Sequence, residues 1–294
     1  MSQQSTKVSQ FFTATITSLV RGILLVGEPV GKLFLQRCTN IANIFSILWA
    51  TFWLALRPST WSPPVRAMFS RQMLFTAIDS IPAALRFSAT VGVLIIVQAA
   101  IWMDIIGISI DSVAPLLWRF VVREASPLLA CLVVIGRSGV AIGTELATMR
   151  AGGEIEVLDS HGIDPMTYLV VPRILAMILS IFCLAIIMAA TTVVTGYYLG
   201  WLMGAIHITW SEFFTDIARN INLQDIVFFG SKTLISGGFA GAICCTDGLN
   251  IRGAITEVPL VSSRVVIHAL TAVFVVSAIL SILFYGKLLV FKIG

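Results

Sequence analysis

Residues 168–201, YLVVPRILAMILSIFCLAIIMAATTVVTGYYLGW, decide the fold class. Arg173 is the only charged residue in this stretch, and it lies near the start. A helix needs about 20 predominantly apolar residues to cross the hydrocarbon core of a bilayer, and the uncharged run after Arg173 is longer than that. We therefore predict a transmembrane helix from Tyr168 to about Trp201.

The composition of the whole chain agrees with this prediction. The chain has 294 residues, of which 57% are hydrophobic and only 12% charged, whereas soluble domains carry about 25% charged residues. No stretch of domain size, about 100 residues, is polar enough to form a separate catalytic or nucleotide-binding domain. The sequence therefore predicts an all-α polytopic membrane protein.

Four further apolar stretches are long enough to span a membrane. They are Phe87–Ile106, Pro115–Ile142, Ile226–Cys245 and Val265–Val290. Together with residues 168–201 they give five predicted spans, which place the two ends of the chain on opposite sides of the membrane. We assign residues 87–294 to a five-helix membrane domain and residues 1–86 to an N-terminal part.

The N-terminal part contains amphipathic segments. Apolar residues follow helical spacing in Phe11–Phe34 and again, more regularly, in Ile41–Leu56. The second segment is shorter than a span and contains Trp49 and Trp53, and tryptophan is enriched at the level of the lipid headgroups. We predict interfacial helices here, and a spanning helix over 41–56 is the alternative.

The distribution of positive charge predicts the orientation. Eight of the 19 Lys and Arg residues precede the first span, and the loop Asp104–Asp111 contains none. Because cytoplasmic loops carry an excess of Lys and Arg, we expect a cytoplasmic N-terminus and a C-terminus on the opposite, periplasmic side.

The second span contains an unusual arrangement of charges. Only 12 residues separate Glu124 from Arg137, too few to cross about 30 Å at 1.5 Å per residue. A helix over Pro115–Gly136 would embed the charges before residue 125, whereas the alternative, Ala125–Gly143, would embed only Arg137. We favour the first placement because it leaves Arg137 on the cytoplasmic side.

Ionisable groups at this depth are costly and mark a candidate site. Arg119 and Arg123 lie four residues apart on one helix face, and with Glu124 they carry a formal charge of +1. This charge suits an anionic headgroup, because a guanidinium can bind phosphate through two parallel hydrogen bonds. The alternative is an Arg–Glu pair that only locks two helices together.

Residues 144–167 form a polar segment that we predict to be a cytoplasmic loop with short helices. Gly162 can end one helix, and Asp164 followed by Pro165 can start the next. The acidic residues before Gly162 give the first helix one charged face, which is suited to a groove on a partner protein. A solvated connecting loop is the alternative.

Other patterns exclude several function classes. Gly27–Lys32 and Gly230–Thr233 both lack the G-x-x-x-x-G-K-[ST] spacing of a phosphate loop, so we expect no ATPase activity in this chain. The five cysteines and three histidines show no metal-ligand spacing. We therefore expect no metal site and no bound cofactor, and the basic residues form no tract for nucleic acid. Gly139 and Gly143 are interpreted as a close helix contact.

Four sequence blocks resemble the MlaE-type permeases (MlaE/YrbE permease family) of MCE-associated ABC lipid transporters. The blocks are VVREASPLLA at 121–130, GRSGVAIGTELATMR at 136–150, GIDPM at 162–166 and VVPR at 170–173. The resemblance implies a homodimer in the bacterial inner membrane, seated on cytoplasmic ABC ATPase subunits that use ATP and capped by a periplasmic MCE-domain protein. The implied cargo is phospholipid or a related lipid, moved between the inner and outer membranes in support of outer-membrane lipid asymmetry.

The resemblance and the residue pattern together give three sets of candidate residues. The lipid-binding candidates are Arg119, Arg123, Glu124, Gln98, Ile101 and Trp102. The ATPase-coupling candidates are Glu145, Arg150, Glu154, Glu156, Leu158, Asp159 and Asp164. The gate or packing candidates are Arg137, Gly139, Gly143 and Arg264. The chain departs from the family pattern at Arg119, where the family more often has an apolar or small residue, and at Ile255–Leu260, which lacks the usual Gly and Arg.

Two other functions are compatible with the sequence. One is an intramembrane lipid-modifying enzyme that uses Glu124 or His161 as an acid or base. The other is a non-transporting membrane anchor for an ATPase. An enzyme predicts covalent turnover of lipid by the chain alone, and an anchor predicts that substitutions at Arg123 have no effect.

Overall fold

The computed structural model describes residue 39 and residues 42–106, 119–204, 209–251 and 258–293. The chain divides into two units, Met1–Ile47 and Leu48–Gly294, and the second contains the helical bundle. Within the described residues the structure is helical and contains no strand. The predicted helix over Phe11–Phe34 lies outside these residues. A helix over Ala42–Leu56 is present and is shorter than a membrane span.

The bundle is built from long helices with a few irregular turns. In chain order the segments are η1 (Pro58–Thr60), α2 (Pro63–Ala77), η2 (Ile78–Ser80), α3 (Ile81–Ile106), η3 (Val121–Ala125), α5 (Ser126–Val134), η4 (Ile135–Gly139), α6 (Val140–Ala151), α7 (Glu154–Ser160), η5 (Met166–Val170), α8 (Val171–Leu202), α9 (Trp210–Asn220), α10 (Leu223–Leu249) and α11 (Val258–Ile293). Of these, η1 and η2 are 3₁₀-helical, whereas η3, η4 and η5 are π-helical turns between α-helices. The described residues include five helical stretches long and apolar enough to span a membrane, which confirms the predicted fold class.

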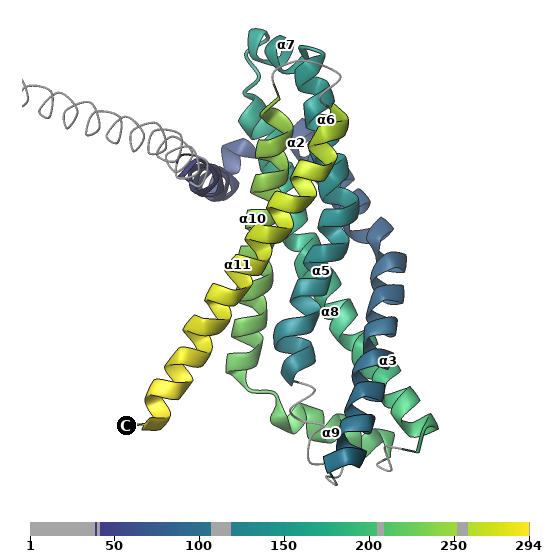
Figure 1. Cartoon of the computed structure of the whole chain (residues 1–294). Coiled ribbons are helices and arrows are strands. Elements are labelled where there is room, and N and C mark those ends of the chain that lie inside the picture. The colour runs from purple at the N-terminus through teal and green to yellow at the C-terminus, as the bar shows by residue number, and fades with distance from the viewer. Residues whose placement is uncertain (1–38, 40–41, 107–118, 205–208, 252–257, 294) are drawn as a thin grey trace, which may run out of the picture. The chain divides into compact units, whose positions relative to one another are not determined.

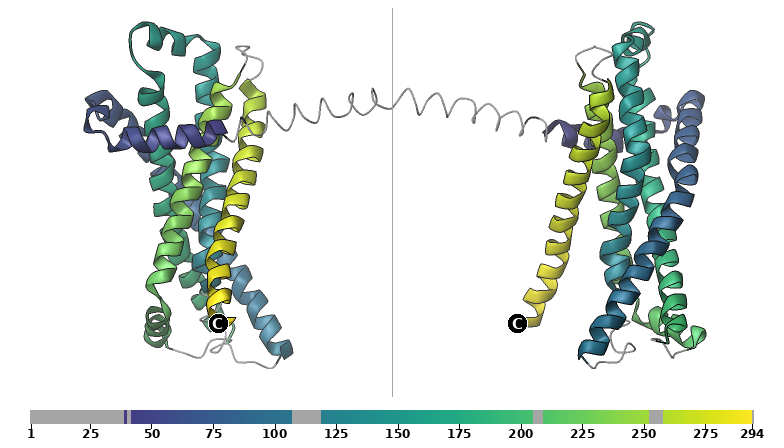
Figure 2. Two further views of the ribbon diagram at one scale, coloured as in Figure 1. Left: turned by 90° about the vertical axis from the view of Figure 1, so that its left-hand side faces the viewer. Right: turned by 45° about the vertical axis from the view of Figure 1, so that its right-hand side comes forward.

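The spans run side by side between two ends of the bundle. One end carries α7, and the other carries α9 and the end of α11 (Figure 1). Both further views show the same arrangement (Figure 2). The long helix α8 packs against α2, α3, α5 and α10, and α10 packs in turn against α6 and α11. The three central spans therefore form the core, while α3 and α11 flank it.

Glycines bring the central helices close together. A Cβ atom on Gly248 of α10 would lie 2.6 Å from the carbonyl oxygen of Gly143 in α6, and a Cβ on Gly143 would lie 2.7 Å from Cγ2 of Val265 in α11. A Cβ on Gly139 would lie 2.9 Å from Sγ of Cys244. No side chain fits at such distances, so the predicted close contact at Gly139 and Gly143 is confirmed.

The helix that contains the second span is longer than either predicted placement, and the level at which it leaves the membrane stays a prediction. The helical stretch continues without a break from Val121 to Ala151, so it stops neither at Gly136 nor at residues 142–143. The predicted start at Pro115 lies outside the described residues. Arg137 lies within this helix; its Nη2 lies 3.4 Å from Oδ2 of Asp79, and its Nη1 donates a hydrogen bond of 3.1 Å to Ser80.

Two predicted boundaries fall inside helices, and one connection contains a further helix. The helix of the first span begins at Ile81 rather than Phe87, so the division between residues 86 and 87 lies inside α3. The first part of the predicted loop 144–167 belongs to α6, which ends at Ala151. The connection between the third and fourth spans contains the amphipathic helix α9, which starts with a capping box formed by Thr209 and Glu212.

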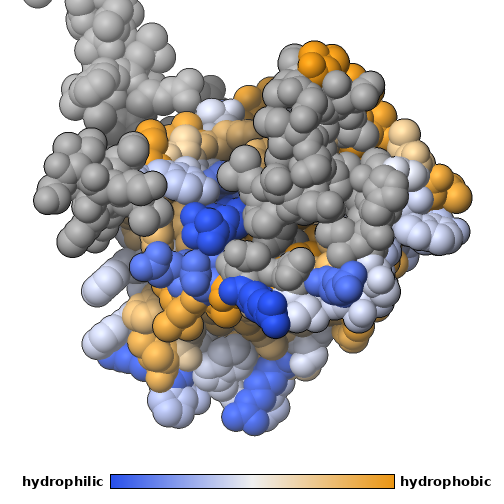
Figure 3. All heavy atoms as spheres, turned by 90° about the horizontal axis from the view of Figure 1, so that it is seen from below, coloured by the Kyte–Doolittle hydropathy of each residue, from blue (hydrophilic) through white to orange (hydrophobic). Residues whose placement is uncertain are grey.

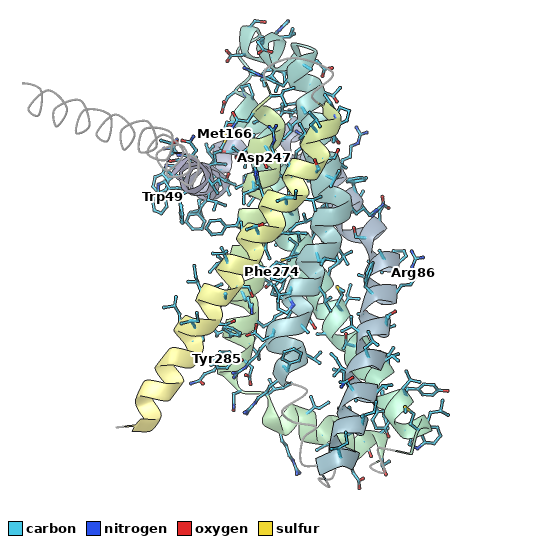
Figure 4. The ribbon with its side chains drawn as sticks, viewed as in Figure 1. Trp49, Arg86, Met166, Asp247, Phe274 and Tyr285 are labelled. Atoms are coloured by element: carbon cyan, nitrogen blue, oxygen red, sulfur yellow. The ribbon has the colours of Figure 1, made fainter. Side chains whose placement is uncertain are left out.

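The outer surface of the bundle is apolar. Large exposed side chains line α3 and α11, among them Leu94, Ile101, Ile267, Phe274 and Ile282; Phe274 is labelled on α11 in Figure 4. The helix Ala42–Leu56 exposes Trp49, Phe52 and Trp53. Apolar surface of this extent requires lipid or another protein chain to cover it.

Candidate functional site

A cluster of paired charges lies where η3, α10 and α11 meet, toward the α9 end of the bundle. Arg123 in η3 forms an ion pair and a hydrogen bond with Asp225, in the first turn of α10. Asp225 also accepts a hydrogen bond of 3.0 Å from the backbone N–H of Asn222, as part of a capping box. The guanidinium carbon of Arg123 lies 5.7 Å from the ring centroid of Tyr285, in the lower part of α11 (Figure 4).

The neighbouring carboxylate binds a different cation. Lys232 in α10 forms an ion pair with Glu124, and its Nζ also donates a hydrogen bond of 3.0 Å to Oγ of Ser281 in α11. Ser281 donates a hydrogen bond of 2.8 Å to Glu124, which closes a three-residue network. The Lys232 side chain is completely buried, so these partners are what make its charge tolerable inside the bundle.

Arg123 and Glu124 are adjacent in the chain but belong to two different ion pairs. Arg123 and Glu124 lie in the π-helical turn η3, a widened turn of a kind that often occurs at functional sites. They do not pair with each other in the described structure, because each binds its own partner on α10. The cluster therefore joins the second span to the fourth and, through Ser281, to the fifth.

The four charged residues of the cluster balance one another, and Arg119 beside them accounts for the net charge of +1 expected from the sequence. Arg123, Glu124, Asp225 and Lys232 together carry no net charge. Arg119 lies one turn before Arg123, and its Nε is buried without a hydrogen-bond partner. Figure 3 views the molecule from this end and shows strongly hydrophilic residues among apolar ones. Arg119 is thus the cation next to the cluster that adds net positive charge.

Four members of the cluster were missed from the sequence: Asp225, Lys232, Ser281 and Tyr285. A signal existed for Lys232, which is a charged residue within the predicted fourth span, Ile226–Cys245. In the sequence, Lys232 is part of Gly230–Thr233, which lacks the phosphate-loop spacing. The rule that ionisable residues inside a span mark a site would have identified it. Ser281 and Tyr285 carry no such signal.

The structure does not gather all of the lipid-binding candidates. Gln98 and Ile101 are exposed on α3, which packs mainly against α8, and the structure describes no contact between them and the cluster. The backbone of Trp102 belongs to α3, but its side chain lies outside the described part.

The opposite end of the bundle carries the predicted coupling residues. Gly153 (φ 74°) and Gly162 (φ 76°) make the turns on either side of α7. Asp164 accepts hydrogen bonds of 3.1 Å from the backbone N–H groups of Met166 and Thr167, so its predicted role in starting the next helix is confirmed. Glu154, Glu156 and Asp159 are exposed and Leu158 is half-buried.

Ion pairs connect the helices at this end. Nη1 of Arg150 lies 2.8 Å from Oε1 of Glu156, which joins α6 to α7, and both side chains are exposed. Nη2 of Arg173 in α8 lies 3.0 Å from Oε1 of Glu145 in α6. Arg264, a gate or packing candidate, is exposed on α11.

Comparison with known proteins identifies the family. The family model "Permease MlaE" matches residues 69–283. A probable ABC transporter permease protein of Rickettsia typhi is 26% identical over 227 residues, covering 77% of this chain and 85% of the relative. A probable ABC transporter permease protein of Synechocystis sp. is 28% identical over 214 residues, covering 73% and 80%. The chloroplastic protein TRIGALACTOSYLDIACYLGLYCEROL 1 of Arabidopsis thaliana is 27% identical over 172 residues, covering 55% and 46%.

The matched region includes η3, α10, the α6–α7 turn and most of each span. It therefore contains the coupling candidates and the charged cluster apart from Tyr285. The five apolar spans and the match to the permease family model indicate that the chain is a multi-pass membrane protein. The chain belongs to the MlaE permease family and is an ABC transporter permease.

Proposed function

We propose that the chain moves phospholipid or a related lipid between the inner and outer membranes, powered by separate cytoplasmic ABC ATPase subunits. The observation that carries this proposal is Arg119 beside the charged cluster, because its buried Nε has no hydrogen-bond partner within the described chain and an ionisable group inside an apolar bundle marks a substrate path. The family match supports transport, and the name of the Arabidopsis relative refers to a glycolipid.

The two ends of the bundle have different roles in this proposal. The α7 end faces the cytoplasm, because the basic residues before the first span belong to that side. The acidic exposed face of α7 docks in a groove on the ATPase. The α9 end faces the periplasm, where an MCE-domain protein receives or delivers lipid. The membrane is the bacterial inner membrane.

The lipid site is formed by two copies of the chain. Exposed apolar residues on the flanking helices are covered by the second copy and by lipid. The headgroup binds Arg119, whose Nε has no partner within the described chain, while the pairs of Arg123 and Glu124 hold the adjacent helices in place. Gln98, Ile101 and Trp102 contact the acyl chains.

Transport then requires two packings of the dimer that differ in their affinity for lipid. ATP-driven closure of the ATPase subunits displaces α7 and changes the packing of the spans. No chemical step on the lipid is needed, and the cofactor of the process, ATP, is bound by the partner.

Arg119→Gln tests the headgroup site with little effect on packing. We expect this variant to assemble with the ATPase, to retain less phospholipid by mass spectrometry of the purified assembly, and to transport less. Arg86→Gln is the control, because Arg86 is exposed on α3 and hydrogen-bonds only to Pro82 of its own helix in the described structure; Figure 4 shows it projecting outward. Unchanged lipid retention and transport in Arg119→Gln would remove Arg119 from the site.

A further inference from the structure

Arg173 is a fully buried cation outside the cluster described above. It lies near the start of α8, and its Nη2 is 3.0 Å from Oε1 of Glu145 in α6. Its Nη1 donates a hydrogen bond of 3.3 Å to the carbonyl oxygen of Leu169 in the π-helical turn η5. Nε and Nη2 make no hydrogen bond of good geometry. The pair therefore depends on charge more than on directed hydrogen bonds.

The pair bridges two helices that both pack against α10 and that differ in their other partners. The glycine contacts of Gly143 hold α6 against α10 and α11, whereas α8 packs mainly against α2, α3, α5 and α10. Helix α6 precedes α7 in the chain, and α8 follows it. The ion pair between Arg173 and Glu145 connects α8 directly to α6.

The two partners differ in exposure. The Arg173 side chain is 0% exposed and that of Glu145 is 52% exposed. The carboxylate can move to solvent with α6, but the guanidinium then remains buried without its counter-charge, which is strongly unfavourable. Movement of α6 away from α8 is therefore opposed until another arrangement satisfies Arg173, including the two nitrogens that lack hydrogen bonds.

We infer that Arg173 is a positioning residue for energy coupling: its ion pair with Glu145 makes α6 and α8 move as one body when the ATPase displaces α7. This inference rests on the proposed function. Without the ion pair, the part of α6 nearest α7 can move while α8 stays in place, so ATP hydrolysis continues and moves less lipid.

Thermal unfolding of the purified chain in detergent tests whether the ion pair between Arg173 and Glu145 stabilises the bundle. Glu145→Gln leaves the buried guanidinium unpaired and is expected to lower the melting temperature most. Arg173→Met leaves only a half-exposed carboxylate, so its effect should be smaller than that of Glu145→Gln, and the double variant should recover stability relative to Glu145→Gln. Glu212→Gln, a neutralisation at an exposed position of α9, is the control. Equal melting temperatures for Glu145→Gln and Glu212→Gln would show that the ion pair does not stabilise the bundle and would overturn the inference.

The amount of lipid transported per ATP hydrolysed tests the role of the Arg173–Glu145 ion pair in energy coupling. The purified chain–ATPase assembly is placed in proteoliposomes with a fluorescent phospholipid, and the double variant Arg173→Met/Glu145→Gln is compared with wild type. We expect an assembled complex that hydrolyses ATP while transport per ATP falls at least about fivefold, the lower range of typical coupling between sites. A wild-type ratio in the double variant would show that the pair is only structural and would overturn the inference.

The two failures are distinguishable. If the wild-type assembly moves no lipid with ATP, the proposed function fails and the coupling role fails with it. If wild type moves lipid and the double variant moves it with the same yield, only the inference fails. The melting temperatures report on the ion pair in either case.

Discussion

Lys232→Met isolates the contribution of the buried cation in the charged cluster. The substitution keeps much of the side-chain volume but removes the charge that Glu124 pairs with. Glu124 is 22% exposed and keeps its hydrogen bond from Ser281, so it retains part of its stabilisation. Breaking a buried pair costs about 3–5 kcal/mol, and we expect the low end, about 3 kcal/mol.

Glu124→Gln removes the other partner and is expected to cost more. It leaves the ammonium of Lys232, which is 0% exposed, with only neutral partners. We expect a loss toward the upper end of the same range, about 4–5 kcal/mol. The double variant Lys232→Met/Glu124→Gln contains no unpaired buried charge and should be more stable than either single variant.

Reversible unfolding of the purified chain in mixed micelles, followed by circular dichroism, measures these differences. Arg86→Met is the control for removal of an exposed cation and should change stability by no more than about 0.5 kcal/mol. The reasoning is refuted if Lys232→Met behaves like this control, or if the double variant loses the sum of the two single losses.

Three further predictions concern packing, the start of a helix and the glycines of the second span. Gly143→Val should lower the melting temperature by an amount equivalent to about 1–3 kcal/mol, because even a Cβ would lie 2.7 Å from Val265. Gly136→Ala should raise stability by about 0.5–1 kcal/mol, because its Cβ has no atom within 4 Å and the backbone is helical. Asp164→Ala should cost about 1 kcal/mol through loss of its capping hydrogen bonds, and hydrogen exchange at the N–H of Met166 should accelerate.

The fold could be predicted from the sequence because each span carries its signal locally. The long apolar runs, the glycine pairs and the Asp164–Pro165 helix start all depend on near neighbours in the chain. The length of the helix that contains the second span could not be predicted in this way, because its last part, α6, packs against α10 and α11, which lie far away in sequence.

The candidate site shows the same division. The charges of Arg123 and Glu124 interrupt an apolar stretch. This interruption alone predicts that both residues belong to a candidate site. Their actual partners, Asp225 and Lys232, lie 102 and 108 residues away. Only the packing of α10 against the second span brings these residues together, and no local pattern encodes it.

The most direct test of the proposed function is ATP-dependent movement of phospholipid by the purified assembly. The chain is reconstituted in proteoliposomes with and without its copurified ATPase, and transfer of a fluorescent phospholipid to acceptor vesicles or an acceptor protein is followed after ATP is added. We predict transfer that requires both ATP and the ATPase, with the lipid chemically unchanged. Covalent conversion of the lipid by the chain alone, or ATP hydrolysis without any lipid movement, would contradict the account.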